Sequence, residues 1–169
     1  ANPVGHGVRS QAGRASATEL PFSDNQLDAV LTDPPYYDNV PYAALSDFFY
    51  VWLKRSIGEH FPELFATSVT PKSSEAIMEP MRHPSTTEAE AFFEEMLGDS
   101  FREFHRVLRP GGIAVIVYAH KTTTGWETML NALVRAGLVV TSSWPLHTER
   151  PGRLRAAASA ALASSIYMI

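Results

Sequence analysis

The stretch LDAVLTDPPYYDN, residues 27–39, passes from an apolar run directly into a stiff loop of prolines, tyrosines and aspartates. The short apolar run predicts a strand, and its continuous apolar character is typical of a parallel sheet that is covered on both faces. In open sheets of this kind, ligands gather beyond the carboxyl ends of the strands. We therefore expect the loop that begins at Asp33 to carry chemistry.

The segment after the loop has the spacing of an amphipathic helix. Apolar residues recur at three- and four-residue steps, which predicts a helix from about Tyr42 to Ile57. We expect Trp52 and the phenylalanines at this spacing to lie in the core. Residues 58–86 contain several prolines and show little periodicity, so they are expected to form a long excursion over the surface.

Two capping boxes predict two further helices. Thr87 with Glu90 is expected to open a helix that residues 109–112, RPGG, bring to an end, because proline cannot continue it and the glycines permit a left-handed turn. Thr124 with Glu127 is expected to open the next helix, which a glycine ends.

The second half of the chain carries three strand patterns. IAVIVYA at 113–119 is the clearest, LVVTSS at 138–143 is a further strand, and SSIYMI at 164–169 is the last. The alanine-rich residues 154–164 before it could instead be helical. The order strand, helix, strand, helix, strand, strand predicts an α/β fold with a mostly parallel sheet and an antiparallel terminal pair.

Composition excludes several classes of protein. The 169 residues contain no cysteine, which excludes disulfides and thiolate metal sites, and the six scattered histidines give no reason to expect a metal. No apolar stretch is long enough to span a membrane, and a cytoplasmic location is expected. The net charge of −4 requires any nucleic-acid binding to come from a local basic patch. Residues 147–155 offer one, with Arg150, Arg153 and Arg155, although a solvated loop is the alternative.

The loop chemistry suits a planar ring with an exocyclic amine. Two prolines fix the backbone and supply no N–H, so the Asp33 carboxylate and the Pro34 carbonyl can accept the two N–H bonds while the ring stacks on Tyr36. No metal is required, but a base in a duplex must first leave the stack. Asp33 could instead brace a turn, and Tyr37 could line the base pocket or pack under it. His120 and Lys121, after the clearest strand, are further candidates for substrate contact.

LDAVLTDPPYYDN resembles the signature of amino-methyltransferases, and its Asp-Pro-Pro-Tyr form is typical of adenine-specific DNA methylases. The resemblance continues through residues 45–55, 104–138 and 143–156, and is closest to the C-terminal part of large prokaryotic methylases said to contain a zinc ribbon. It implies a Rossmann-like class I sheet, S-adenosylmethionine as the methyl donor, DNA as the partner, and a catalytic loop formed by Asp33, Pro34, Pro35 and Tyr36.

The chain departs from that family where the donor should bind. The glycine-rich donor loop and the acidic ribose ligand are absent, and only Ser16, Thr18 and Asp33 are left to approach the donor. We therefore expect residues 18–169 to form the second half of a methyltransferase domain, after an irregular lead-in at 1–17, with the first half upstream in the same polypeptide.

The missing half has physical consequences. The strand at 27–32 should have an unpaired edge, so we expect the isolated chain to self-associate or to fold residues 1–17 over that edge. We also expect it to be inactive and to bind the donor weakly or not at all. The alternatives are a non-catalytic nucleic-acid-binding or interaction module, and a methyltransferase for another amine: cytosine N4, RNA guanine or glutamine.

Overall fold

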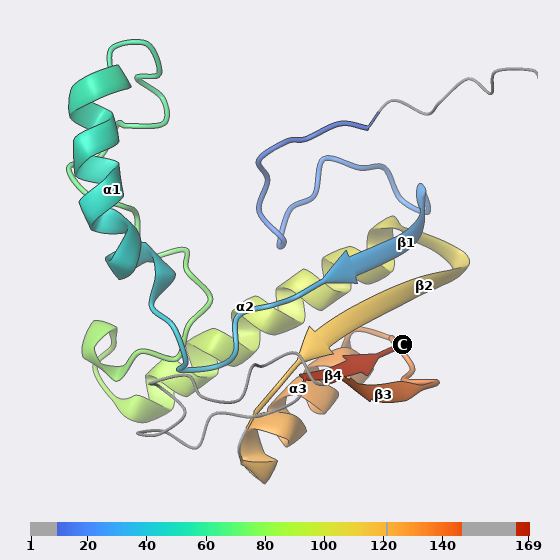
Figure 1. Cartoon of the computed structure of the whole chain (residues 1–169). Helices are drawn as coiled ribbons and strands as arrows, with labels where there is room; N and C mark the ends of the chain where they lie inside the picture. The colour runs from blue at the N-terminus through green and yellow to red at the C-terminus, as the bar shows by residue number, and fades with distance from the viewer. Residues whose placement is uncertain (1–9, 121, 147–164) are drawn as a thin grey trace, which may run out of the picture.

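A computed structural model describes residues 10–120, 122–146 and 165–169 of the chain. The strands follow the predicted sequence of elements, except that two helices and a short 3-10 helix, rather than one helix, lie between the first two strands (Figure 1). The elements are β1 (Leu27–Thr32), α1 (Tyr42–Ile57), the short 3-10 helix η1 (Pro80–Arg82), α2 (Thr86–Val107), β2 (Leu108–Tyr118), α3 (Thr123–Arg135), β3 (Ser143–Leu146) and β4 (Ser165–Met168). The α/β class predicted from the sequence is confirmed.

The four strands form one mixed sheet in the order β1-β2-β4-β3. β1 and β2 are parallel, as a crossover connection requires, and β4 is antiparallel to both β2 and β3. The predicted antiparallel terminal pair is confirmed. The prediction of a mostly parallel sheet is wrong for the described residues, because β4 lies between β2 and β3 and makes two of the three pairings antiparallel.

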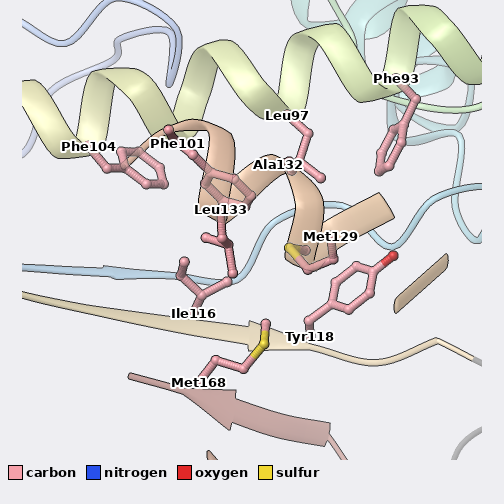
Figure 2. Close-up of a cluster of buried hydrophobic side chains, with 11 residues drawn as sticks. Phe93, Leu97, Phe101, Phe104, Ile116, Tyr118, Met129, Ala132, Leu133 and Met168 are labelled. Atoms are coloured by element: carbon pink, nitrogen blue, oxygen red, sulfur yellow. The ribbon is translucent and has the colours of Figure 1, made fainter. Parts of the chain in front are cut away.

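The core lies between one face of the sheet and the helices α2 and α3 (Figure 2). Phe93, Leu97 and Phe101 of α2 meet Met129 and Leu133 of α3 above the strands, and each is at most 2% exposed. Alternate residues of β2 point into this layer, as expected for a strand with one buried face.

The opposite face of the sheet is open. Leu31 of β1 is 76% exposed and Ile113 of β2 is 51% exposed. The expectation that the first strand is covered on both faces is therefore wrong for the part of the chain that the structure describes. The apolar sequence of β1 predicts that its faces are covered. It does not tell whether this part of the chain, another segment or another molecule covers them.

Two helix starts lie slightly upstream of their prediction. Ser85 caps α2 by accepting from the Glu88 N–H at 3.2 Å, and Thr122 caps α3 by accepting from the Gly125 N–H at 3.2 Å. Both cap residues have extended backbone, the geometry an N-cap needs. The capping boxes at Thr87 and Thr124 are wrong because the hydroxyl residues before them take the role.

Two strand boundaries also differ from the pattern. Residues 109–112 do not form a turn after the helix but run on within β2, with Gly111 in the left-handed region at φ 76°. Residues 138–142 are irregular, and the strand predicted there begins only at Ser143. In place of a ladder, the N–H groups of Thr141 and Ser142 donate to the Ile169 carbonyl. The alanine-rich segment 154–164 lies outside the described residues.

Helix α1 has the predicted bounds but not the predicted burial. It leaves the body of the molecule beyond the end of β1, and the irregular segment that follows it turns back along it (Figure 1). Phe48, Phe49 and Trp52 are each more than half exposed, so their assignment to the core is wrong for this chain. A helical period shows that one face is apolar but not which surface covers it.

β1 forms an outer edge of the sheet. Within residues 10–120, 122–146 and 165–169, no segment pairs with its free side. Residues 10–17 are exposed, and apart from the isolated bridge between Ser16 and Glu19 they form no strand pairing with the described residues. No helix of the described part of the chain has the length and apolar character of a membrane span.

Candidate functional site

The two candidate loops lie at the same end of the sheet. β1 and β2 are parallel, with Thr32 beside Ile116, so their carboxyl ends point the same way. Asp33 follows β1 directly, and His120 lies two residues beyond the end of β2. The expectation that the chemistry-bearing residues gather beyond these strand ends agrees with this placement.

Asp33 is exposed, and Tyr36 is half-buried beside it. Burial, and then a hydrogen bond to the Asp33 carboxylate, raise the pKa of Tyr36 to about 12. The Tyr36 hydroxyl is therefore protonated at neutral pH, close to the Asp33 carboxylate. Its ring meets the Tyr118 ring edge-on, with the centroids 5.5 Å apart at 76°. This ring is packed against the core rather than standing free.

The Pro34 carbonyl is an available acceptor. Within the described residues, no backbone or side-chain group donates to it. The loop closes just beyond, where the Asn39 N–H donates to the Tyr36 carbonyl at 3.0 Å. The Asp33 carboxylate and the Pro34 carbonyl are thus adjacent acceptors on a backbone that two prolines stiffen.

Tyr37 fixes the second half of the loop to α2. Its φ of 53° lies in the left-handed region, which costs a non-glycine residue about 1–3 kcal/mol unless its surroundings compensate. The Tyr37 hydroxyl donates to Glu90 Oε1 at 3.0 Å, its carbonyl accepts from the Met78 N–H at 3.0 Å, and its ring meets the Phe93 ring edge-on at 5.3 Å. Burial and then the bond to Glu90 raise the pKa of Tyr37.

His120 completes an aromatic cluster at this end of the sheet. Its ring lies 5.2 Å from the Tyr37 ring at 87° and is nearly parallel to the Tyr118 ring at 6.2 Å. The imidazole Nδ1 accepts from the Thr122 N–H at 3.1 Å, and the His120 carbonyl accepts from the Trp126 indole at 3.0 Å. These bonds hold the ring between the loop and the start of α3.

Ser16 and Thr18, the predicted donor contacts, form a separate turn. The Ser16 and Thr18 hydroxyls bond each other at 2.8 Å, and the turn they form is fixed to α2 where the Leu20 N–H donates to Glu103 at 2.7 Å. No interaction within the described residues joins this turn to Asp33. The predicted contacts at Lys121, Arg150, Arg153 and Arg155 lie outside the described residues.

Sequence reasoning missed several neighbours of the loop. The sequence predicts Glu90 to cap a helix, but its carboxylate accepts from the Tyr37 hydroxyl, 53 residues earlier in the chain. Tyr118 is buried under Tyr36, while Ser165 interacts with Tyr36 from β4. The aromatic residue at the end of the clearest strand was the only signal available, because the other contacts depend on tertiary structure.

A pocket of about 580 Å³ lies away from this cluster. It is lined by the amino-terminal half of β2, the residues after α3 and the last residues of the chain. Among the residues that the structure describes, no group of three or more His, Asp or Glu side chains could hold a metal ion. Comparisons with protein-family models, with curated proteins and with solved structures give no match to this chain.

Proposed function

We propose that the loop Asp33–Tyr36 is the catalytic loop of an S-adenosylmethionine-dependent enzyme that methylates the exocyclic N6 amine of adenine in DNA. The observation that carries the proposal is the pair of adjacent acceptors, the exposed Asp33 carboxylate and the Pro34 carbonyl, on a stiff loop at the carboxyl end of β1. The choice of methyl transfer as the reaction and of adenine as the substrate comes from the resemblance of Asp-Pro-Pro-Tyr to the methylase signature.

The two acceptors act on the amine by orienting it. An adenine amine is a poor nucleophile because its lone pair is delocalised into the ring. Hydrogen bonds from its two N–H groups to Asp33 and Pro34 favour a pyramidal nitrogen with a directed lone pair. An ionised carboxylate has about four acceptor positions, so Asp33 can hold the Tyr36 hydroxyl and the amine at the same time.

The aromatic cluster supports the rigidity that this role needs. Tyr37, Glu90 and Phe93 fix the loop to α2, and Tyr118 supports Tyr36 from β2. Catalytic groups must be held close to their productive geometry, and packed neighbours do this better than a free loop. An adenine that stacks on this cluster must first leave the duplex, at a cost of a few kcal/mol that stacking would offset.

The described residues fit only part of a donor site. S-adenosylmethionine supplies a methyl group on a sulfonium when it is bound, but the Ser16–Thr18 turn bonds to itself, and the sequence has no glycine-rich loop to hold the rest of the donor. We therefore propose that the chain is the catalytic-loop half of a longer Rossmann-like enzyme. The open edge of β1 and the open face of the sheet support this, because both suit further chain packed there.

The second candidate is a non-catalytic nucleic-acid-binding or interaction module. The missing glycine loop favours it for this chain alone, whereas the intact acceptor pair favours an enzyme. A methyltransferase for cytosine N4, for guanine in RNA or for glutamine would use the same acceptors. Lys121, Arg150, Arg153 and Arg155 remain the predicted DNA contacts.

Replacement of Asp33 in the longer protein tests the proposal. Asp33→Ala should reduce methylation of adenine in DNA by about 10²–10³-fold, because one oriented acceptor is lost, while donor binding is unchanged. Transfer of labelled methyl and calorimetric donor binding measure the two effects. Glu59→Ala, a change at an exposed carboxylate just after α1, is the matched control.

Two results would oppose the proposal. Full activity in the Asp33→Ala protein would remove Asp33 from catalysis. Micromolar binding of S-adenosylmethionine to the isolated 169-residue chain would show that its donor site is complete, contrary to the half-domain interpretation.

A further inference from the structure

Helix α1 has one face that the chain itself covers. The segment that follows the helix turns back along it. It forms hydrogen bonds and an ion pair with helix residues that are three or four positions apart and therefore lie on one face. Glu75 accepts from the Ala43 N–H at 2.8 Å, and Lys72 pairs with Asp47 at 2.8 Å. The covered face continues where Tyr50 and Lys54 bond to Thr67, with the Lys54 Nζ 2.6 Å from the Thr67 carbonyl.

The opposite face is apolar and open. Leu45 is 61% exposed, Phe48 and Phe49 are 66% exposed, Trp52 is 57% exposed and Leu53 is 46% exposed. Within this face, the Phe48 ring lies edge-on to the Phe49 ring at 5.4 Å and to the Trp52 ring at 6.5 Å. The polar contacts of α1 thus face its own chain, and its largest apolar side chains face outward. An exposed apolar face of this kind is typical of a binding surface.

We propose that this face, Leu45 to Leu53, binds the same face of a second copy of the chain as an antiparallel helix pair. Leu45 and Leu53 each lie four residues from Phe49, so the row reads the same in both directions. A two-fold axis at Phe49 places each Leu45 against the partner's Leu53 and brings the two Phe49 rings together. Rows of residues four apart form the ridges that interlock in the commonest packing of helix pairs.

The size of the face suits a dimer. An aromatic side chain buries about 150–250 Å² when it is fully covered. When Tyr42 is added to the face Leu45 to Leu53, four aromatics and two leucines about half to two-thirds exposed offer on the order of 600 Å² per copy, approaching the roughly 800 Å² per partner of a stable interface. Tyr42, 60% exposed, is the fourth aromatic, at the start of the helix.

Charge favours a protein partner over nucleic acid. Asp47 is paired with Lys72 and Lys54 is bonded to Thr67, so both lie on the covered face. Arg55 lies over the Trp52 ring, with its guanidinium carbon 5.7 Å from the ring centroid, at the edge of the apolar row. One cation at the rim does not make a phosphate-binding surface. An antiparallel pair also sets the two helix dipoles in opposite directions.

The absence of cysteine allows a direct test of register with the whole 169-residue chain. In oxidising buffer, Leu45→Cys mixed with a mass-tagged Leu53→Cys should give a mixed disulfide at least tenfold faster than either variant gives a homodimer. Phe49→Cys should cross-link with itself. Homodimers of Leu45→Cys that form as fast as the mixed species would overturn the antiparallel pairing.

Sedimentation equilibrium tests the interface itself. The unmodified chain should be dimeric at about 100 μM, and Phe49→Glu should weaken the dimer at least 100-fold because two buried charges would meet at the axis. Val134→Glu on α3 is the matched control, since Val134 is 68% exposed and outside the face. Far-UV circular dichroism verifies that each variant is folded.

Two outcomes would overturn the proposal. One is a monomeric unmodified chain at that concentration, which leaves the face to a different partner. The other is a dimer that Leu31→Glu dissociates and Phe49→Glu does not, because Leu31 lies on β1 and that result would assign self-association to the sheet. Neither outcome bears on catalysis, which is tested separately at Asp33.

Discussion

Helices α1 and α2 have similar apolar spacing and opposite burial. Along α2, Phe93, Leu97, Phe101 and Phe104 are at most 5% exposed, whereas the corresponding row of α1 is about half to two-thirds exposed. Both rows predict a helix, and both helices are present. The difference shows that apolar spacing determines where a helix forms and which face it presents, but not what covers that face.

The cause of the difference is the way each helix is connected. α2 runs back along the sheet into β2, so its apolar face meets the strands and α3. α1 begins immediately after the proline-rich loop and projects beyond the strand ends (Figure 1). Its own chain contributes polar ties to Asp47, Tyr50 and Lys54 and leaves the phenylalanines open.

The largest expected effect contrasts one phenylalanine from each helix. Phe101→Ala on α2 should lower the free energy of unfolding by about 3–5 kcal/mol, because it leaves a cavity in the core. Phe48→Ala on α1 should change it by less than about 1 kcal/mol in dilute, monomeric protein, because the ring is mostly exposed. Urea unfolding followed by circular dichroism measures both changes.

Equal losses in the two variants would remove the distinction between the helices. A large loss for Phe48→Ala that disappears on dilution would instead place its contribution in the interface between copies. The slope of the urea transition should be unchanged in both proteins if each unfolds in a single step.

The sequence predicts the local features of this fold well and the tertiary ones poorly. The bounds of α1 are predicted from apolar spacing alone, and they agree with the structure. The sequence does not predict how much of α1 is buried, because burial depends on what packs against the helix. The helix caps were misassigned because Ser85 and Thr122 compete with the residues after them, and only backbone conformation decides between such neighbours.

The same division applies to the candidate site. Asp33 and Tyr36 were predicted at a strand end because strand and loop are adjacent in the chain. The partners that fix the loop come from elsewhere: Glu90 from α2, Tyr118 from β2 and Ser165 from β4. No spacing rule connects residues so far apart, so the acceptors were predictable and their support was not.

The next effect compares glycines in the two packed helices. Gly98 in α2 has room for a methyl group, since an added Cβ would lie 3.5 Å from the Arg102 side chain. Gly98→Ala should therefore stabilise the protein by up to about 1 kcal/mol through helix propensity. Gly125 in α3 has none, because an added Cβ would overlap the His120 imidazole. Gly125→Ala should destabilise it by about 1–3 kcal/mol.

Thermal unfolding distinguishes these two variants by the opposite signs of their shifts. The near-UV circular dichroism of the aromatic cluster should also change in Gly125→Ala, because the His120 ring must leave its present position beside Tyr37 and Tyr118. Stabilisation by Gly125→Ala would mean that His120 leaves its position at little cost and does not hold the loop.

The smallest effect concerns carboxylates on α2 and α1. Hydrogen bonds from the Arg106 guanidinium, and then from the Leu20 N–H, lower the pKa of Glu103 from 4.5 to about 2. A pKa that is lower in the folded state stabilises the fold above the unfolded value, so this contribution is present above about pH 4.5 and is lost as the pH falls to about 2. The stability difference between the unmodified chain and Glu103→Gln should shrink over that interval.

The pKa of Asp47 on α1 is also lowered in the folded protein, but the effect of acid is expected to differ. Its pKa is lowered chiefly by the hydrogen bond from Lys72, so acid weakens this tie as well. Because the open face of α1 does not join the core, loss of the tie should open the helix locally rather than unfold the protein. Asp47→Asn should therefore speed amide exchange in α1 and leave the urea midpoint unchanged. A shift of that midpoint as large as the one in Glu103→Gln would show that α1 unfolds together with the core.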